Sequence, residues 1–176
     1  MAEPADAAQM IAELVATTPL VDTHEHLMEE ARRLEARADP EGKKGPISDI
    51  GILFSHYSDS DLVVAGMLPD DLQKVRTATM PPKEKFRLLA PHYAAARHTG
   101  YLRNVRESLR LLYGEDDLTE ANCESISEKI ADGVKPGFYK HILQDVANIE
   151  YCQVNNLEVP VFCETEMPEL LAQDIS

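Results

Sequence analysis

Apolar residues along most of the chain recur at intervals of three and four, which is the spacing of an α-helix. The pattern is clearest over residues 7–15, 101–113 and 139–149, where it places the apolar side chains on one helical face. Pro19 and Gly114 follow the first two of these segments, and both residue types are typical of helix ends. Further helices are predicted over 27–38, from Ser60, from Pro69, over 83–90 with a break or kink at Pro91, from a capping box at Ser125 to Gly133, and over 168–171. The chain is therefore expected to be mostly helical.

Two short segments have the composition of β-strands instead. Residues 20–26 are a short, partly β-branched segment that begins with an apolar pair, and residues 157–163 are largely apolar and partly β-branched, as buried strands commonly are. Two strands so far apart in the sequence do not form a stable sheet by themselves. The pattern leaves two interpretations open, an all-α protein with two extended segments or the beginning of a larger α/β protein.

Composition and charge narrow the functional classes. The 176 residues are 44 % hydrophobic and 27 % charged, which is typical of a globular domain. With 17 Lys and Arg against 31 Asp and Glu the formal charge is −14, which disfavours a nucleic-acid or anionic-membrane partner. No apolar run approaches the roughly 20 residues of a membrane span, the first residues do not resemble a signal peptide, and the three cysteines form no CxxC pair. We therefore expect a cytoplasmic protein without disulfides.

The most distinctive motif is a pair of histidines separated by one residue. Because side chains alternate along a strand, Asp22, His24 and His26 are predicted on one face, with Thr23 and Glu25 on the other. Two imidazoles on one face can bind the same divalent ion, and imidazole suits zinc, iron or nickel. A carboxylate such as that of Asp22 commonly holds the far ring nitrogen of a ligand histidine. The spacing is equally that of two solvated histidines at the end of a strand.

Around this pair the sequence resembles the amidohydrolase superfamily. Residues 20–27, an apolar pair followed by Asp-x-His-x-His-Leu, are similar to the first barrel strand of that superfamily. Residues 95–101 and 111–118 are similar to the helical insertion of amidohydrolase-related proteins close to uronate isomerases. The resemblance implies an α/β fold, a (β/α)8 barrel with its metal at the carboxyl ends of the strands. Residues 1–176 would be the N-terminal part of this barrel with its first two strands, and 28–156 a helical insertion after the first strand.

The resemblance also implies a function. His24 and His26 would be ligands of a divalent metal, with zinc expected, and Asp22 would support them from outside the ligand set. The expected reaction is hydrolysis of a C–N or C–O bond in a small-molecule substrate by a metal-activated water. A barrel needs about 250 residues, so the remaining ligands and the catalytic aspartate would lie beyond Ser176. The chain is then expected to be a fragment that binds metal weakly and is inactive.

Two alternatives to a hydrolase stay open. One is an isomerase or decarboxylase acting on a carboxylate substrate, as the likeness to uronate isomerases implies, and the other is a non-catalytic helical interaction module. An unfinished barrel would also expose strand edges, which makes a homo-oligomer a possible assembly.

Several other side chains are candidates for a site, although for each of them packing or a surface position is the default. One group consists of basic residues that could bind an acidic substrate and one neighbouring tyrosine: His56, Tyr57, His92, Arg97, His98 and Arg103. Cys163 ends the second predicted strand, and Glu164 and Glu166 follow it. These three residues are candidates for a site at the end of that strand. The alternative is a buried cysteine followed by a solvated acidic turn. The sequence contains no GxGxxG, P-loop, GxSxG or HExxH motif, so dinucleotide, nucleotide-phosphate, serine-hydrolase and zincin functions have no support.

Overall fold

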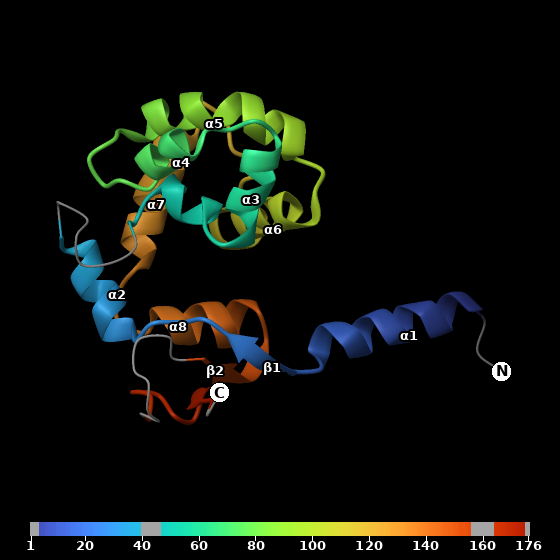
Figure 1. Ribbon diagram of the computed structural model, residues 1–176. Coiled ribbons are helices and arrows are strands. Elements are labelled where there is room, and N and C mark those ends of the chain that lie inside the picture. The colour runs from blue at the N-terminus through green and yellow to red at the C-terminus, as the bar shows by residue number, and fades with distance from the viewer. Residues whose placement is uncertain (1–3, 40–46, 156–163, 175–176) are drawn as a thin grey trace. The chain divides into compact units, whose positions relative to one another are not determined.

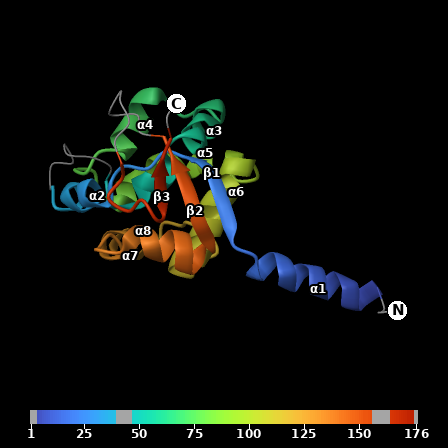
Figure 2. The same ribbon diagram turned by 90° about the horizontal axis from the view of Figure 1, so that it is seen from below.

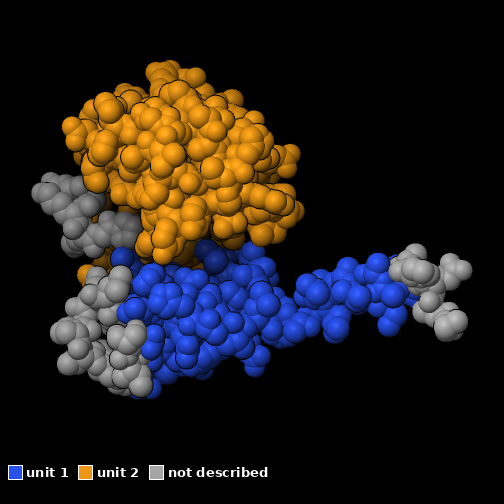
Figure 3. Space-filling model, turned by 45° about the vertical axis from the view of Figure 1, so that its right-hand side comes forward, with its two compact units in different colours: residues 1–29, 139–176 blue, residues 30–138 orange. Residues whose placement is uncertain are grey.

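The computed structural model describes residues 4–39, 47–155 and 164–174. The chain divides into two compact units, which are called unit 1 and unit 2 below (Figure 3). Unit 1 consists of residues 1–29 and 139–176, and unit 2 of residues 30–138. In the described part of the chain no helix is long and apolar enough to span a bilayer.

Unit 1 contains a small parallel β-sheet (Figure 2). Its strands are β1 (Leu20–Glu25), β2 (Ile149–Val154) and β3 (Leu171–Gln173), in the order β1-β2-β3. Both neighbouring pairs are parallel, so the three carboxyl ends lie at the same edge of the sheet. A mostly helical chain with a parallel sheet agrees with the predicted α/β class.

The structure corrects two element predictions in unit 1. The helix predicted over 139–149 is α8 (Phe138–Lys140) followed by the π-helical turn η3 (His141–Val146), and the chain then enters β2 at Ile149. Asn148 has a φ of 52°, in the left-handed region that ends a helix, and the residues after it pair with β1 as a strand. The segment 168–171, predicted helical, is a turn that leads into β3. The strand predicted over 157–163 lies outside the described residues.

The first helix of the chain, α1 (Pro4–Thr17), confirms the predicted helix over 7–15. Every side chain from residue 6 to residue 17 is exposed. These include the apolar stripe of the helix, where Leu14 is 66 % and Val15 70 % exposed. The spacing therefore predicts the helix correctly, but this stripe is not buried in the structure.

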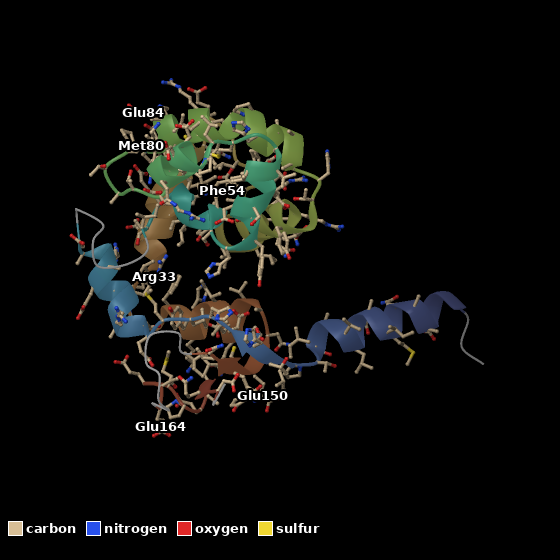
Figure 4. All side chains as sticks on the ribbon, viewed as in Figure 1. Arg33, Phe54, Met80, Glu84, Glu150 and Glu164 are labelled. Atoms are coloured by element: carbon tan, nitrogen blue, oxygen red, sulfur yellow. The ribbon has the colours of Figure 1, made fainter. Side chains whose placement is uncertain are left out.

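Unit 2 is a helical assembly around one apolar core (Figure 1). Its elements are α2 (Glu30–Arg37), the 3₁₀ turn η1 (Ile50–Phe54), α3 (Tyr57–Val64), α4 (Pro69–Val75), α5 (Pro82–Ala96), α6 (Gly100–Ser108), the π-helical turn η2 (Leu109–Tyr113) and α7 (Cys123–Gly133). The fully buried core side chains Phe54, Leu62, Leu89, Leu102 and Ile126 come from five different elements. Figure 4 shows Phe54 among these helices. The compact helical unit ends at residue 138, and β2 lies inside the range 28–156 that was expected to be the insertion.

Helix ends in unit 2 follow the sequence in some places and not in others. Gly114 has a φ of 72° and ends η2 in the left-handed conformation, as predicted. By contrast, α5 continues through Pro91, because the buried residues on either side, Leu89 and Tyr93, hold the helix against the core. The capping box predicted at Ser125 does not form, since α7 begins at Cys123 and the Ser125 hydroxyl donates to a carbonyl one turn earlier.

A buried ion pair lies at the N-terminal end of η1. The Lys85 side chain is fully buried, and its Nζ is 2.6 Å from Oδ2 of Asp49. The other carboxylate oxygen of Asp49 accepts the backbone N–H of Gly51 at 2.8 Å. Burial lowers the pKa of Lys85, although the Asp49 carboxylate acts in the opposite direction. Asp49 thus both compensates a buried charge and caps the turn that carries Phe54 into the core.

Candidate functional site: a histidine pair on the first strand

The two histidines of the motif converge in the structure. His24 is in β1 and His26 follows the end of that strand. Their Nε2 atoms are 3.2 Å apart, and the ring centroids are 4.7 Å apart with the planes at 87°. The prediction that both imidazoles project to the same place is confirmed.

The distance between the ring nitrogens is close to that of two histidine ligands on one metal ion. Two nitrogens that each lie 2.0–2.1 Å from a tetrahedral zinc ion are about 3.3 Å apart. The observed 3.2 Å agrees with this value. The same distance also suits an N–H···N hydrogen bond between two neutral rings. The separation of the two nitrogens is thus compatible with either arrangement.

A carboxyl group fixes the backbone that carries the first imidazole. Oδ1 of Asp22 accepts the backbone N–H of His24 at 3.0 Å. The Glu25 carboxyl is close enough to Asp22 and to the backbone of His26 for both to influence its pKa. The hydrogen bond that the structure gives Asp22 therefore goes to the backbone, and its support of an imidazole ring stays a prediction.

The contact between Asp22 and Glu25 corrects the predicted placement of Glu25 on the opposite face of the strand. The pairing of β1 with β2 shifts register between these two residues, which breaks the strict alternation on which the prediction rested. Burial raises the pKa of Glu25 to about 7, and the neighbouring Asp22 carboxylate acts in the same direction. Two carboxyl groups in contact share a proton more readily than they both ionise.

The histidine pair lies at the carboxyl edge of the sheet. Asn155, which follows β2, donates its backbone N–H to the carbonyl of Glu25 at 2.8 Å. Asp174, which follows β3, donates its own to the carbonyl of Val154 at 2.9 Å. Ligands of parallel α/β sheets bind beyond this edge. Across the described ranges, however, no group of three or more His, Cys, Asp and Glu side chains is arranged to hold a metal ion.

Neighbouring candidates do not extend the donor set. Cys152, the register partner of Asp22 in β2, is fully buried. Burial raises the pKa of its thiol to about 11, and the carboxylates of Asp22 and Glu25 act in the same direction, so the thiol stays protonated at neutral pH. Glu164 and Glu166 are exposed, as their alternative interpretation expects. Cys163 lies outside the described residues.

The basic and aromatic candidates of the sequence all lie in unit 2, and they separate into two groups. His92 donates from Nδ1 to the carbonyl of Ala65 at 3.1 Å, and Tyr57 stacks on Tyr101; these contacts are structural. Residues of the second group line a cavity of about 480 Å³, formed by Arg97, His98, Arg103, Arg106, Glu107, Arg110 and Asp116. Sequence reasoning selected the first three of these and missed Arg106 and Arg110. Their spacing from Arg103, three and then four residues along one helical face, was the available signal.

Comparison with protein-family models, with curated proteins and with solved structures gives no match for this chain. The geometry of the histidine pair and the motif that surrounds it are the features that bear on function.

Proposed function

We propose that His24 and His26 bind a divalent metal ion, with zinc the expected one, as part of a metal-dependent hydrolase of the amidohydrolase type. The observation that carries the proposal is the 3.2 Å separation of the two Nε2 atoms at the carboxyl edge of a parallel sheet. The resemblance of residues 20–27 to the first strand of that superfamily supports the same chemistry.

The residues of β1 have distinct parts in this proposal. The imidazoles hold the ion, while Asp22 keeps the backbone at His24 in place through the N–H group that it accepts. When bound, such an ion lowers the pKa of a water ligand toward neutrality and polarises a substrate oxygen. Catalytic zinc normally has three protein ligands, so the proposal needs a further ligand from outside the described residues. The 176-residue chain is expected to bind zinc weakly and to show no turnover.

The proposal is tested by calorimetric titration of the metal-free chain with zinc. We expect saturable binding at a single site that His24→Ala and His26→Ala each remove, because one imidazole alone does not hold the ion. His141→Ala is the matched control, since His141 is another exposed histidine of unit 1, with its Nδ1 3.2 Å from Asp145. Binding that survives in both strand variants, or that is lost with His141→Ala instead, would contradict the assignment.

A non-catalytic helical module is the second candidate. It is favoured by the closed core of unit 2 and by the lack of a third metal ligand among the residues that the structure describes. The same titration distinguishes the two candidates, because the helical module is not expected to bind zinc. Cooperative thermal unfolding that zinc does not affect would also support the module.

A further inference from the structure

The cavity of unit 2 gathers positive charge in a protein that is otherwise strongly acidic. Four arginines and His98 line it, against the carboxylates of Glu107 and Asp116, whereas the whole chain carries a formal charge of −14. Clustered guanidinium groups repel one another unless an anion lies between them. The excess of positive charge around this cavity thus contrasts with the net negative charge of the chain and indicates a place where an anion could bind.

Helix α6 and the turn η2 present three of these arginines in a regular way. Leu102, Val105 and Leu109 are buried in the core, and Arg103, Arg106 and Arg110 each follow one of them. The buried residues anchor the helix, so the adjacent arginines share a neighbouring face. Thr99 caps α6 and also donates its hydroxyl to Asp61 at 2.5 Å, which fixes the start of the helix.

Two of the four arginines are held by one carboxylate. Arg97 Nη2 is 2.6 Å and Arg106 Nε 3.8 Å from the Asp117 oxygens, and Asp117 also accepts the hydroxyl of Tyr93 at 2.5 Å. The Nε donors of Arg97 and Arg106 are buried and have no hydrogen-bond partner in the described part of the chain. A single carboxylate thus leaves part of the donor capacity of both guanidinium groups unused.

Arg103 completes the set of unused donors. Arg110 pairs with Glu107 at 2.9 Å, but within the described ranges the side chains of Arg103 and His98 form no hydrogen bond and no ion pair. The planar guanidinium fork matches the oxygens of a carboxylate or phosphate group in a bidentate manner. Arg103 is exposed, so an incoming anion can reach it without displacing a protein group.

We propose that this cavity binds a small organic oxyanion that carries two or more negatively charged groups, either carboxylates or phosphates. Its volume of about 480 Å³ lies in the range of small-molecule sites. The Arg103 guanidinium is available to bind the anion directly. Arg97 and Arg106, whose charges Asp117 partly neutralises, line the cavity together with His98. The residues that line the cavity all belong to unit 2, and the proposed binding does not depend on the proposed metal.

The test uses calorimetric titration of the full chain, freed of metal, with two probes in separate experiments. Inorganic pyrophosphate represents phosphate compounds and tricarballylate represents polycarboxylates, so the stronger binder identifies the source of the oxyanion. Arg103→Ala is expected to weaken binding about tenfold or more, because a charge-assisted bidentate contact is lost. Since Arg103 has no protein partner among the described residues, this variant should fold normally.

Arg87→Ala is the matched control. Arg87 lies on α5 outside the cavity, with a side chain that is 65 % exposed and paired with Glu120, so the change removes the same charge elsewhere in unit 2. We expect this variant to bind within about twofold of the parent, because distant surface charges are screened. His24→Ala should also bind the probes normally, which separates this proposal from the metal site. Absence of saturable binding of either probe, or equal weakening by Arg103→Ala and Arg87→Ala, would overturn it.

Discussion

The two compact units differ in where they place their apolar side chains. Helix α6 of unit 2 and helix α1 of unit 1 have the same three- and four-residue apolar spacing. In α6, Leu102 is completely buried, whereas in α1 Leu14 is 66 % exposed. Equal sequence patterns thus lead to opposite degrees of burial.

The difference shows what holds each helix in place. A helix of ordinary length gains most of its stability from packing of its apolar face and little from intrinsic propensity. Unit 2 provides such packing through a core drawn from seven helices and turns. Among the described residues of unit 1, by contrast, buried apolar side chains are confined to β2, β3 and the segments next to them, namely Tyr139, Cys152, Val154, Leu170 and Leu171. We therefore expect unit 2 to dominate the stability of the chain.

The largest effect is expected where unit 2 buries a charge. Asp49→Ala leaves the ammonium of Lys85 without its partner and removes the cap of η1, so it should lower the free energy of unfolding by about 3–5 kcal/mol. Urea denaturation followed by circular dichroism measures the change. The double variant Asp49→Ala/Lys85→Met should recover most of the lost stability, because methionine fills the space of the buried lysine side chain without placing a charge there. A double variant as unstable as Asp49→Ala would show that the cap, and not the buried charge, is what matters.

The comparison of the two helices can be tested directly with one type of substitution. Leu102→Ala should destabilise unit 2 by about 2–4 kcal/mol through lost burial and the cavity left behind. Leu14→Ala should change stability by less than about 0.5 kcal/mol, because the side chain is already in solvent. Amide hydrogen exchange resolved by peptide assigns each effect to its unit. A cost for Leu14→Ala similar to that for Leu102→Ala would mean that α1 is covered in solution.

The sequence was most informative where a local signal acts alone. The helical spacing predicted α1 and α6. Gly114 marked the end of η2, because the chain needs a left-handed backbone conformation at that position and glycine adopts it readily. The convergence of His24 and His26 was also predictable, since it depends on two residues that are only two positions apart in the sequence. Each of these features is decided within a few residues.

Tertiary contacts account for the features that the sequence did not predict. Burial of Leu89 and Tyr93 carries α5 through Pro91, and pairing with β1 turns residues 149–154 into a strand. A register shift in that pairing places Glu25 beside Asp22. The core against which Leu89 and Tyr93 pack and the strand that pairs with residues 149–154 come from distant parts of the sequence. The metal, the hydrolase activity and the barrel remain predictions.

Among the buried side chains considered, the smallest expected effect concerns a polar contact of Tyr93 at the rim of the core in unit 2. Burial first, and the neighbouring Asp117 carboxylate second, raise the pKa of Tyr93. The folded protein then keeps the phenol proton above pH 10, about where tyrosine in the unfolded chain ionises. Stability from this group is complete below that pH and falls above it, by up to about 1.4 kcal/mol per pH unit.

Tyr93→Phe should therefore lower the free energy of unfolding at neutral pH by about 1–2 kcal/mol, because the hydrogen bond to Asp117 is lost. It should also make the decline in stability between about pH 9 and 11 shallower than in the parent, since one of the groups that couples folding to pH is gone. Urea denaturation at several alkaline pH values measures both effects, and hydrogen exchange shows whether they are confined to unit 2. Equal slopes for parent and variant would mean that Tyr93 ionises as readily in the folded protein as in the unfolded chain, and would contradict its burial beside Asp117.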